Sequence, residues 1–564
     1  MIRNLLLITT VAVIAACTSP STTSQPQIPV FADSAMVVTA HPLATEIGLQ
    51  VLKDGGNAFD AAVAVQYALA VAYPEAGNIG GGGFMVGRRA DGTVVTLDFR
   101  EKAPMLANRD MYLDSLGEVI PDLSWFGHLA AGVPGAVAGM QFLHDSLGSI
   151  PMARLIQPAI DLAKSGYDLT PYATGVLHEK LEYIQQYNTQ PNTFTAKTDW
   201  REGDHMQFPN LAKTLERIRD QGMKGFYEGE TAELILAEME RGGGIITKKD
   251  LISYRPKWRP AVTGTYHDLE IISMGPPSSG GIALIQLLNS IEPFPVHEYA
   301  PNSTEAVHLF TEAERRVFAD RAEHLGDPDF HRVPIQGLTE KSYQQARMQS
   351  FDLEKATPSD SVAAGIPQVF ESEQTTHFSI VDADGNAVSI TTTLNGNFGS
   401  CVLVGGAGFF LNNEMDDFSS KPGVANYFGL VGAEANAIAP GKRMLSSMTP
   451  TIVLKNGNLW MVVGTPGGSK IITSVFQTIV DVHDFGLNIQ EAVTLPRVHA
   501  QWLPDEIWQE PGALSPSVME DLSAKGHQIK EINPYGHVDA ILVLEDGKLA
   551  GGADPRGDSH SSGF

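Results

Sequence analysis

The segment Gln374-Thr375-Thr376-His377-Phe378 places a threonine where a polar stretch ends and a strand-like stretch begins. A threonine within a chain is a weak nucleophile, because no neighbouring base takes the proton of its hydroxyl. If the chain were cut directly before Thr375, the new α-amine would lie beside the hydroxyl of the same residue and could accept that proton. The segment therefore predicts self-cleavage between Gln374 and Thr375, followed by acyl transfer on the Thr375 hydroxyl.

The strand that follows Thr375 reaches an Asp384-Gly385 turn, which is typical of a β-hairpin. A two-residue turn pairs Thr376 with Thr393, whereas a three-residue turn that adds Ala383 pairs Thr375 with Thr393. Both registers bring Thr393 close to the nucleophile, where its hydroxyl could orient that of Thr375. As an isolated feature, the threonine triplet that ends at Thr393 is also what strand propensity alone would favour.

Several longer motifs surround this hairpin in a definite order. They are Asn78-Ile-Gly-Gly-Gly-Gly83, Leu97-Asp-Phe-Arg-Glu101, Asn412-Asn-Glu-Met-Asp-Asp-Phe418, Pro440-Gly-Lys-Arg-Met-Leu-Ser-Ser-Met448 and Gly464-Thr-Pro-Gly-Gly-Ser469. Together with Thr375-Thr-His-Phe-Ser379, they resemble the gamma-glutamyltranspeptidase (gamma-glutamyltransferase, glutathione hydrolase) family. The resemblance runs from about residue 35 to residue 564.

The resemblance implies a role for each of ten residues. Thr375 would be the nucleophile, with Thr393 supporting it and the N–H groups of Gly467 and Gly468 receiving the oxyanion. The other six would hold the charged end of a gamma-glutamyl donor: Arg100, Ser446 and Ser447 its α-carboxylate, and Asn395, Glu414 and Asp417 its α-ammonium. Position 414 is glutamate where some relatives have glutamine, and both side chains can accept from an ammonium. Residues 421–435, with Tyr427 and Phe428, correspond to the loop that covers the donor pocket in some members.

The resemblance also implies an α+β fold, a four-layer αββα sandwich of the N-terminal-nucleophile hydrolase type. Residues 35–374 would form a large subunit and residues 375–564 a small subunit, joined as a heterodimer from one precursor. The donors would be glutathione and other gamma-glutamyl amides, with water, amino acids or peptides as acceptors. No metal or organic cofactor is implied, and no helical His-Glu-x-x-His or paired Cys-x-x-Cys motif suggests a metal.

The elements that must position these residues can be placed from local patterns. Asn57 is expected to cap an apolar helix over 58–72, preceded by a helix over 44–53 that ends at Gly55-Gly56. Residues 106–347 read as mostly helical, interrupted by a strand over 269–273. Further elements are expected as strands at 84–86 and 94–100, helices at 282–291 and 469–485, and hairpins at Asp384-Gly385 and Asn456-Gly457. Residues 351–374 read as an exposed processing loop.

The N-terminus reads as a targeting segment. Apolar residues from Leu5 to Ala16 end in Ile14-Ala-Ala-Cys17, which resembles a bacterial lipoprotein cleavage box. Residues 1–16 would be removed, Cys17 lipidated, and residues 17–34 would form a flexible tether. The alternative is an ordinary secretory signal with an incidental cysteine. Either interpretation predicts export to the periplasm, and the first predicts membrane attachment through the lipid anchor alone.

Composition and the remaining motifs narrow the function classes. The formal charge of −26 argues against nucleic acid as a partner. Cys401 is the only cysteine besides Cys17, and we expect it to be a buried apolar residue. The run Gly80–Gly83 lacks the Gly-Lys-Ser/Thr ending of a phosphate loop. Two rival functions remain: a glutaryl- or cephalosporin-type acylase of the same fold, and a surface-anchored binding protein that never matures. A glutaryl group lacks the α-ammonium that Asn395, Glu414 and Asp417 would bind.

Overall fold

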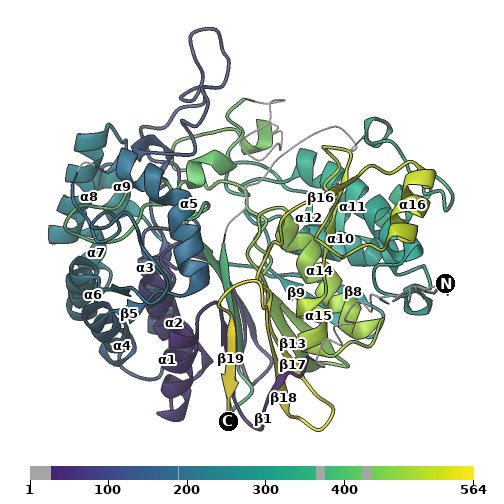
Figure 1. The fold of residues 1–564 in the computed structure, drawn as a ribbon, viewed down its shortest axis with the longest axis horizontal. Helices are drawn as coiled ribbons and strands as arrows, with labels where there is room; N and C mark the ends of the chain where they lie inside the picture. Colours follow the sequence, from purple (N-terminus) through teal and green to yellow (C-terminus); the bar gives the residue numbers. More distant parts are fainter. Residues whose placement is uncertain (1–26, 189, 364–374, 422–433) are drawn as a thin grey trace, which may run out of the picture.

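The computed structural model describes residues 27–188, 190–363, 375–421 and 434–564. Two antiparallel sheets lie face to face at the centre, and helices cover the outer face of each sheet (Figure 1). The four layers are helix, sheet, sheet and helix, which confirms the predicted αββα sandwich. Cys17, Gln374, Tyr427 and Phe428 lie outside the described residues. Within the described residues, every helix is too short or too polar to span a bilayer.

Each central sheet has seven strands among the described residues. Sheet A has the order β1 (Val30–Ala32), β18 (Leu549–Ala553), β17 (Asp539–Val543), β13 (Asn458–Gly464), β12 (Thr451–Lys455), β9 (Leu269–Ser273) and β8 (Val262–Tyr266). Sheet B has the order β19 (His560–Gly563), β2 (Met36–Thr39), β10 (Thr376–Val381), β11 (Ala387–Thr393), β3 (Gly82–Arg88), β4 (Val94–Asp98) and β7 (Lys257–Arg259). β10, which begins directly after Thr375, is therefore an interior strand of sheet B.

Hydrogen bonds and apolar side chains join the two sheets. Val38 and Phe84 of sheet B share one buried cluster with Val462 of sheet A. The Ser379 hydroxyl donates to the carbonyl of Asp539 at 3.0 Å, and the Ser389 hydroxyl donates to the carbonyl of Val463 at 3.1 Å. Because both strands of the β10–β11 hairpin are tied across the sandwich, the position of Thr375 depends on both sheets.

The helix layer against sheet B contains the predicted apolar helix. α1 (Pro42–Lys53) and α2 (Ala58–Ala72) pack on each other and against the sheet. Asn57 caps α2 through a capping box with Asp60, and every residue of α2 is buried. The remaining helices of this side are α3 (Ala136–Leu147), α4 (Met152–Ser165), α5 (Pro171–Tyr187), α6 (Pro209–Gln221), α7 (Lys224–Tyr227), α8 (Gly229–Gly242) and α9 (Lys248–Ser253).

The helix layer against sheet A confirms two further predicted helices. They are α10 (Gly280–Ile291) and α14 (Lys470–His483), which lie side by side on the sheet (Figure 1). Other helices of this side are α11 (Thr304–His324), α12 (Ile335–Thr339), α13 (Lys341–Met348), α15 (Ile489–Thr494) and α16 (Pro516–Lys525). Small sheets pair β5 (Tyr167–Asp168) with β6 (His205–Met206), and β14 (Val498–His499) with β15 (Ile507–Gln509) and β16 (Ile529–Glu531).

Two local predictions were wrong. Residues 106–127, read as the start of a helical region, form turns, because Pro, Gly and Asp residues recur there without a helical apolar stripe. Residues 351–363, read as an exposed loop, are partly docked, and Ser359 and Val362 are buried. The strand at 269–273 was placed correctly, but the sequence did not indicate its partner β8. Cys401 is fully buried, as expected.

Candidate active site

The β10–β11 hairpin presents Thr375 at the end of its first strand. Thr376 pairs with Thr392, so continuing the register by one residue sets Thr375 opposite Thr393. This is the register of the three-residue turn, in which the Asp382 amide bonds the carbonyl of Asn386 and Gly385 adopts a φ of +87°. Thr375 has an exposed fraction of only 6%. Of the two registers left open by the sequence, the structure has the second.

His377, two residues after Thr375, is a structural group rather than a base. Its Nδ1 lies 2.9 Å from the Thr391 hydroxyl and its Nε2 lies 3.1 Å from the Ser379 hydroxyl. Burial lowers the pKa of His377 to about 3, so the ring is neutral at ordinary pH. A side chain at Gly464 of sheet A would meet this ring at 2.4 Å. The neutral imidazole therefore fills the space between the two sheets, two residues along β10 from Thr375.

Thr393 and Asn395 connect the hairpin to the loop at residues 412–417. The Thr393 hydroxyl accepts the backbone N–H of Asn395 at 2.7 Å, and the Asn395 amide donates to the carbonyl of Asn413 at 3.0 Å. Asn395 has a φ of +74°, a conformation that asparagine tolerates better than most residues. The sharp turn after β11 therefore holds the acidic loop against the end of the β10–β11 hairpin.

The glycine run at 80–83 allows the backbone to pack closely against this hairpin. A Cβ on Gly81 would lie 1.9 Å from the Thr393 carbonyl oxygen, and one on Gly80 would lie 2.0 Å from that of Phe410. A Cβ on Gly82, the residue paired with Thr393, would lie 2.7 Å from a carboxylate oxygen of Glu101. The run is therefore a packing feature, and it brings Glu101 directly behind the strand pair that holds Thr375.

Arg100 lies at the centre of a buried group of charges, which we call the Arg100 cluster: Arg100, Glu101, Glu414 and Asp417. Nη1 of Arg100 lies 2.5 Å from a Glu414 oxygen and 3.6 Å from a Glu101 oxygen. Nη2 bonds Asp417 and, at 3.1 Å, the carbonyl of Leu445. Arg100, Glu414 and Asp417, predicted to bind opposite ends of a donor, therefore contact one another in this structure.

The Arg100 cluster contains more carboxyl groups than cationic side chains. Both carboxylate oxygens of Glu101, Oε1 of Glu414 and Oδ1 of Asp417 have no hydrogen-bond partner among the described residues. Burial raises the pKa of Glu101 to about 8 and that of Glu414 well above its usual range. Burial also raises the pKa of Asp417, although Arg100 partly offsets this. A buried surplus of carboxyl groups favours binding of a cationic group such as an ammonium.

Ser446 and Ser447 border the cluster and contact a second arginine. The Ser446 carbonyl accepts the hydroxyl of Ser279 at 2.7 Å. Arg321 of α11 donates through Nε to the Ser279 hydroxyl at 2.8 Å and through Nη2 to the Ser447 hydroxyl at 3.3 Å. Arg321 is 1% exposed and also lowers the pKa of Asp417. The serine pair is therefore held by a buried cation.

Sequence reasoning missed Glu101 and Arg321. Glu101 directly follows Arg100 in the Leu97–Glu101 motif, so the sequence could have indicated that Glu101 belongs to the site. Arg321 had no comparable signal, because it belongs to a polar-looking helix whose charged residues are buried only by the tertiary fold.

Gly467 and Gly468 lie just ahead of α14, where unbonded helix N–H groups and the helix dipole favour negative charge. Their φ angles are +133° and +60°, which only glycine adopts without strain. Gly467 and Thr375 line the same cleft, which has a volume of about 550 Å³. This arrangement is suited to holding an oxyanion formed at Thr375.

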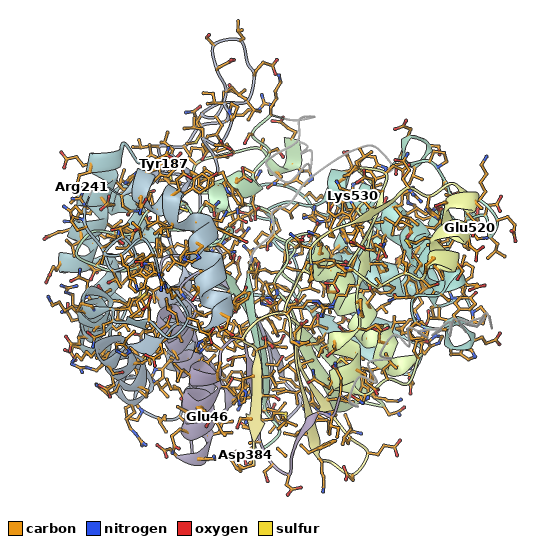
Figure 2. All side chains as sticks on the ribbon, viewed as in Figure 1. Glu46, Tyr187, Arg241, Asp384, Glu520 and Lys530 are labelled. Carbon is orange, nitrogen blue, oxygen red and sulfur yellow. The ribbon has the colours of Figure 1, made fainter. Side chains whose placement is uncertain are left out.

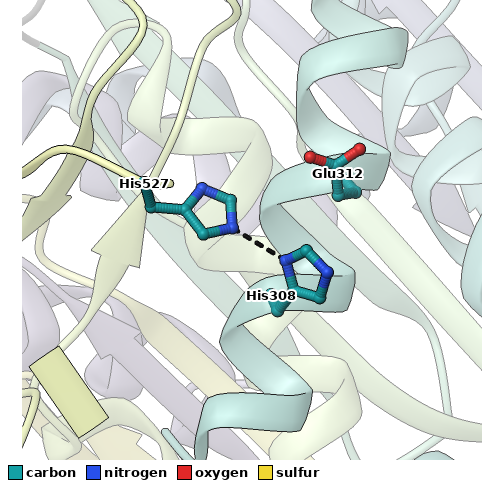
Figure 3. Close-up of side chains that lie close together, drawn as sticks. All are labelled: His308, Glu312 and His527. Atoms are coloured by element: carbon teal, nitrogen blue, oxygen red, sulfur yellow. Dashed lines mark hydrogen bonds between the residues drawn. The ribbon is translucent and has the colours of Figure 1, made fainter. Parts of the chain in front are cut away.

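A separate group of side chains has the composition of a metal site: His308, Glu312 and His527 (Figure 3). Both ring nitrogens of His308, Nε2 of His527 and both oxygens of Glu312 are already bonded within the protein. Nε2 of His308 lies 2.8 Å from the carbonyl of Asp352, and its Nδ1 lies 2.7 Å from Nε2 of His527. Glu312 accepts from Arg315, Arg316 and Thr357. A cation beside two guanidinium groups would be repelled, so we interpret this group as structural.

The chain matches known proteins over nearly its full length. The family model described as Gamma-glutamyltranspeptidase matches residues 44–564. The glutathione hydrolase proenzyme of Escherichia coli (strain K12) is 47% identical over 538 residues, which cover 94% of this chain and 91% of the relative.

Solved structures agree with this match. A gamma-glutamyltranspeptidase of Helicobacter pylori is 46% identical with a TM-score of 0.57, covering 58% of this chain and 95% of that chain. A cephalosporin acylase of Bacillus halodurans is 27% identical with a TM-score of 0.84, covering 97% and 99%. The likeness therefore includes both classes of enzyme that the sequence left as alternatives.

Proposed function

The chain belongs to the gamma-glutamyltranspeptidase family, and we propose that it is a self-processing gamma-glutamyltransferase and glutathione hydrolase. The observation that carries the gamma-glutamyl assignment is the surplus of buried carboxyl groups in the Arg100 cluster. A glutamyl donor brings an α-ammonium that can bond these groups and an α-carboxylate that can pair with Arg100. A glutaryl donor has no ammonium and would leave the surplus uncompensated.

Processing would use the same hydroxyl as catalysis. The Thr375 oxygen adds to the carbonyl carbon of Gln374, and the peptide C–N bond breaks as the nitrogen takes the proton. Water then hydrolyses the resulting ester, which leaves a free carboxylate on Gln374 and a free amine on Thr375. This amine is the base that the intact chain lacks.

The mature enzyme would follow a two-step exchange. The Thr375 oxygen bonds the gamma-carbonyl carbon while the freed amine takes its proton and the N–H groups of Gly467 and Gly468 bond the oxyanion. The C–N bond then breaks, and the proton passes to the departing amine. Water or an acceptor amine attacks the gamma-glutamyl ester, the ester C–O bond breaks, and the proton returns to the Thr375 oxygen.

The strand pairing supports a two-chain product that stays assembled after cleavage. In sheet B, β10 and β11 of the small subunit pair with β2 and β3 of the large subunit. In sheet A, β12 pairs with β9 and β18 pairs with β1. Both sheets are therefore shared between residues before and after the cut, so that separating the subunits would break both.

We also propose that the enzyme is exported and held at the membrane by a lipid on Cys17. The support is the apolar segment that ends at Cys17 and the polar tether that follows it. Expression of the full chain in a bacterium with lipoprotein processing should give a membrane-associated protein. A Cys17→Ala variant should be released, and mass spectrometry of the mature N-terminus would show whether a diacylglycerol is present.

Release of the aniline from a gamma-glutamyl anilide tests the proposed activity. We expect the soluble domain to cleave into two chains and release the aniline, and Thr375→Ala to do neither, with a loss of at least about 10³-fold. Thr375→Ser is the matched control, because it keeps a hydroxyl and should retain part of both reactions. A correctly cleaved enzyme that released no aniline would contradict the gamma-glutamyl assignment but not the nucleophile.

A further inference from the structure

The two glycines proposed to receive the oxyanion cannot hold their own position. Gly467 and Gly468 both have positive φ angles and no side chain, so their backbone is freer to rotate than that of any other residue type. An effective oxyanion donor must point at the developing charge before the reaction begins. The groups that fix these two N–H donors must therefore come from the residues on either side of them.

Each side of the glycine pair is tied to another part of the small subunit. On the N-terminal side, the Thr465 hydroxyl accepts the backbone N–H of His537 at 3.0 Å. On the C-terminal side, the Ser469 hydroxyl donates to the side-chain oxygen of Gln501 at 2.6 Å. Both Ser469 and Gln501 are buried. The bond to Gln501 is therefore the side-chain contact directly next to Gly468.

The orientation of the Gln501 amide follows from its contacts. Its nitrogen donates to the carbonyl of Leu503 at 3.2 Å, so its oxygen faces Ser469 and, at 3.0 Å, Nε2 of His499. Burial lowers the pKa of His499 to about 3, so the imidazole is neutral and carries a single proton. This proton lies on Nε2, because an amide oxygen can only accept.

His499 extends the contact along the first turn of α14. With the proton on Nε2, Nδ1 of His499 is an acceptor and receives the hydroxyl of Thr473 at 2.8 Å. Ser469 and Thr473 are four residues apart, so their side chains lie on the same face of the helix. His499 and Gln501, which we call the helix clamp, therefore hold one face of the start of α14 through two neighbouring hydroxyls.

The glycine pair belongs to the turn that the helix clamp holds. The carbonyl of Gly467 accepts the N–H of Lys470 at 3.1 Å, and the carbonyl of Gly468 accepts the N–H of Ile471 at 3.0 Å. A shift of the start of α14 would therefore move both glycines with it. Displacement of a catalytic group by about 1 Å is enough to lower a rate by about 10²-fold.

The small sheet that contains part of the helix clamp lies at the catalytic end of the molecule. β14 pairs with β15, and β15 pairs with β16. Lys530 of β16 lines the cleft that also contains Thr375 and Gly467. Figure 2 shows Lys530 towards the top of the view, whereas Asp384, in the turn at the far end of the β10–β11 hairpin, lies at the bottom. The clamp is therefore close to the end of the hairpin that carries the nucleophile.

We propose that the helix clamp positions the oxyanion donors: it holds the start of α14 so that the N–H groups of Gly467 and Gly468 face the carbonyl attacked by Thr375. This inference rests on the proposed function and adds the residues that preorganise these donors. Neither member of the clamp is among the described residues that line the cleft, so both act through α14. Acylation and deacylation both pass through an oxyanion, so the clamp serves both steps.

Replacement of Gln501 by methionine tests the proposal, because methionine has a similar length but is at most a weak acceptor. On processed enzyme with a gamma-glutamyl anilide, we expect Gln501→Met to lower kcat by about 10- to 30-fold and to keep KM within about threefold, since only the transition state loses a contact. Ser469→Ala, which removes one hydroxyl, should lower kcat about fivefold. Gln501→Glu should recover most of kcat, because burial favours its protonated form, which has one acceptor and one donor as the amide does.

Gln477 provides the matched control. Its side chain also joins α14 to β14, since it donates to the carbonyl of Val498 at 2.7 Å and accepts the N–H of Val498 at 3.3 Å. This contact lies about two helical turns beyond the glycine pair. Gln477→Met should therefore lower the melting temperature about as much as Gln501→Met, because both lose buried hydrogen bonds, but keep kcat within about twofold of wild type.

The outcomes separate positioning from general stability. A kcat within about twofold of wild type in both Gln501→Met and Ser469→Ala would overturn the proposal, and so would an equal loss of kcat in Gln477→Met. Ser469→Ala keeps the test measurable even if Gln501→Met does not self-cleave. A wild-type enzyme that self-cleaved but released no aniline would instead contradict the proposed function.

Discussion

The Arg100 cluster and the group around Glu312 are both buried sets of charges, but they differ in how completely those charges are paired. Glu312 receives Arg315 at 2.5 Å, Arg316 at 2.7 Å and the hydroxyl and amide of Thr357. Although burial alone would raise its pKa, Arg315 and these partners hold the pKa of Glu312 below its usual range. In the Arg100 cluster, by contrast, several carboxylate oxygens have no partner among the described residues.

The difference distinguishes a structural group from a binding site. Glu312 and its arginines anchor residues 357–359, which precede the predicted processing site, and the arginines also bond Ser359 and the carbonyl of Arg347. Both carboxylate oxygens of Glu312 accept hydrogen bonds, so Glu312 gains nothing from a ligand. The Arg100 cluster is destabilised as it stands, and a ligand that supplied an ammonium would relieve it. Incomplete pairing in a buried site is therefore itself a signal of function.

Removing the central cation of the unpaired cluster should have the largest effect. We expect Arg100→Met to lower kcat/KM for a gamma-glutamyl anilide by about 10²- to 10³-fold, because the donor carboxylate loses the guanidinium proposed to bind it. Arg100→Lys should recover part of this loss, since it keeps the charge but not the planar fork. Steady-state kinetics on cleaved enzyme would measure the change. A kcat/KM within threefold of wild type would mean that Arg100 does not bind the donor.

Removing one carboxylate from each group gives the sharpest test of the comparison. Glu312→Gln should lower the free energy of unfolding by about 3 kcal/mol, because the buried guanidinium of Arg316 loses this counter-charge and that of Arg315 is left with Asp505. Glu414→Gln should change stability by less than about 1 kcal/mol, since it reduces a surplus of acid. Thermal unfolding of the two variants, compared with wild type, would measure this difference. Equal destabilisation by both would contradict the distinction between the groups.

The smallest effect should come from the histidine pair beside Glu312. His308 Nε2 faces the carbonyl of Asp352 and therefore carries its proton, so Nδ1 of His308 accepts from Nε2 of His527. Nδ1 of His527 has no partner among the described residues. Burial, followed by the charge of His308, lowers the pKa of His527 to about 4. The folded protein thus holds this ring neutral.

Because the unfolded chain binds this proton more readily, the stability contributed by His527 is complete above about pH 6.5 and falls as the pH drops towards 4. Between pH 7 and pH 5.5 we expect a loss of about 1 kcal/mol from this residue. His527→Gln, which keeps a donor towards His308, should lack this part of the pH dependence. Thermal unfolding at the two pH values would measure it, and identical slopes in variant and wild type would contradict the assignment.

Local patterns in the sequence predicted Thr375 as the nucleophile and indicated the elements next to it. The hairpin at Asp384-Gly385 and the helices predicted over 58–72, 282–291 and 469–485 follow from turn chemistry, capping and apolar periodicity, although the choice between the two hairpin registers came only from the structure. Each of these features depends on residues that are close together in the chain, so the local sequence is enough to predict it. The motifs also indicated which residues belong to the site, but only through resemblance to a family.

Tertiary structure decided which of those residues meet and how their charges are paired. Arg100 contacts Asp417, 317 residues later in the chain, and the carbonyl of Leu445, 345 residues later. Local sequence patterns cannot predict contacts between residues so far apart in the chain. The buried positions of Glu101, Arg321 and Lys470 likewise depend on how sheets and helices pack. The pairing of the charges and their pKa values are properties of that packing, because burial sets the energy of each charge.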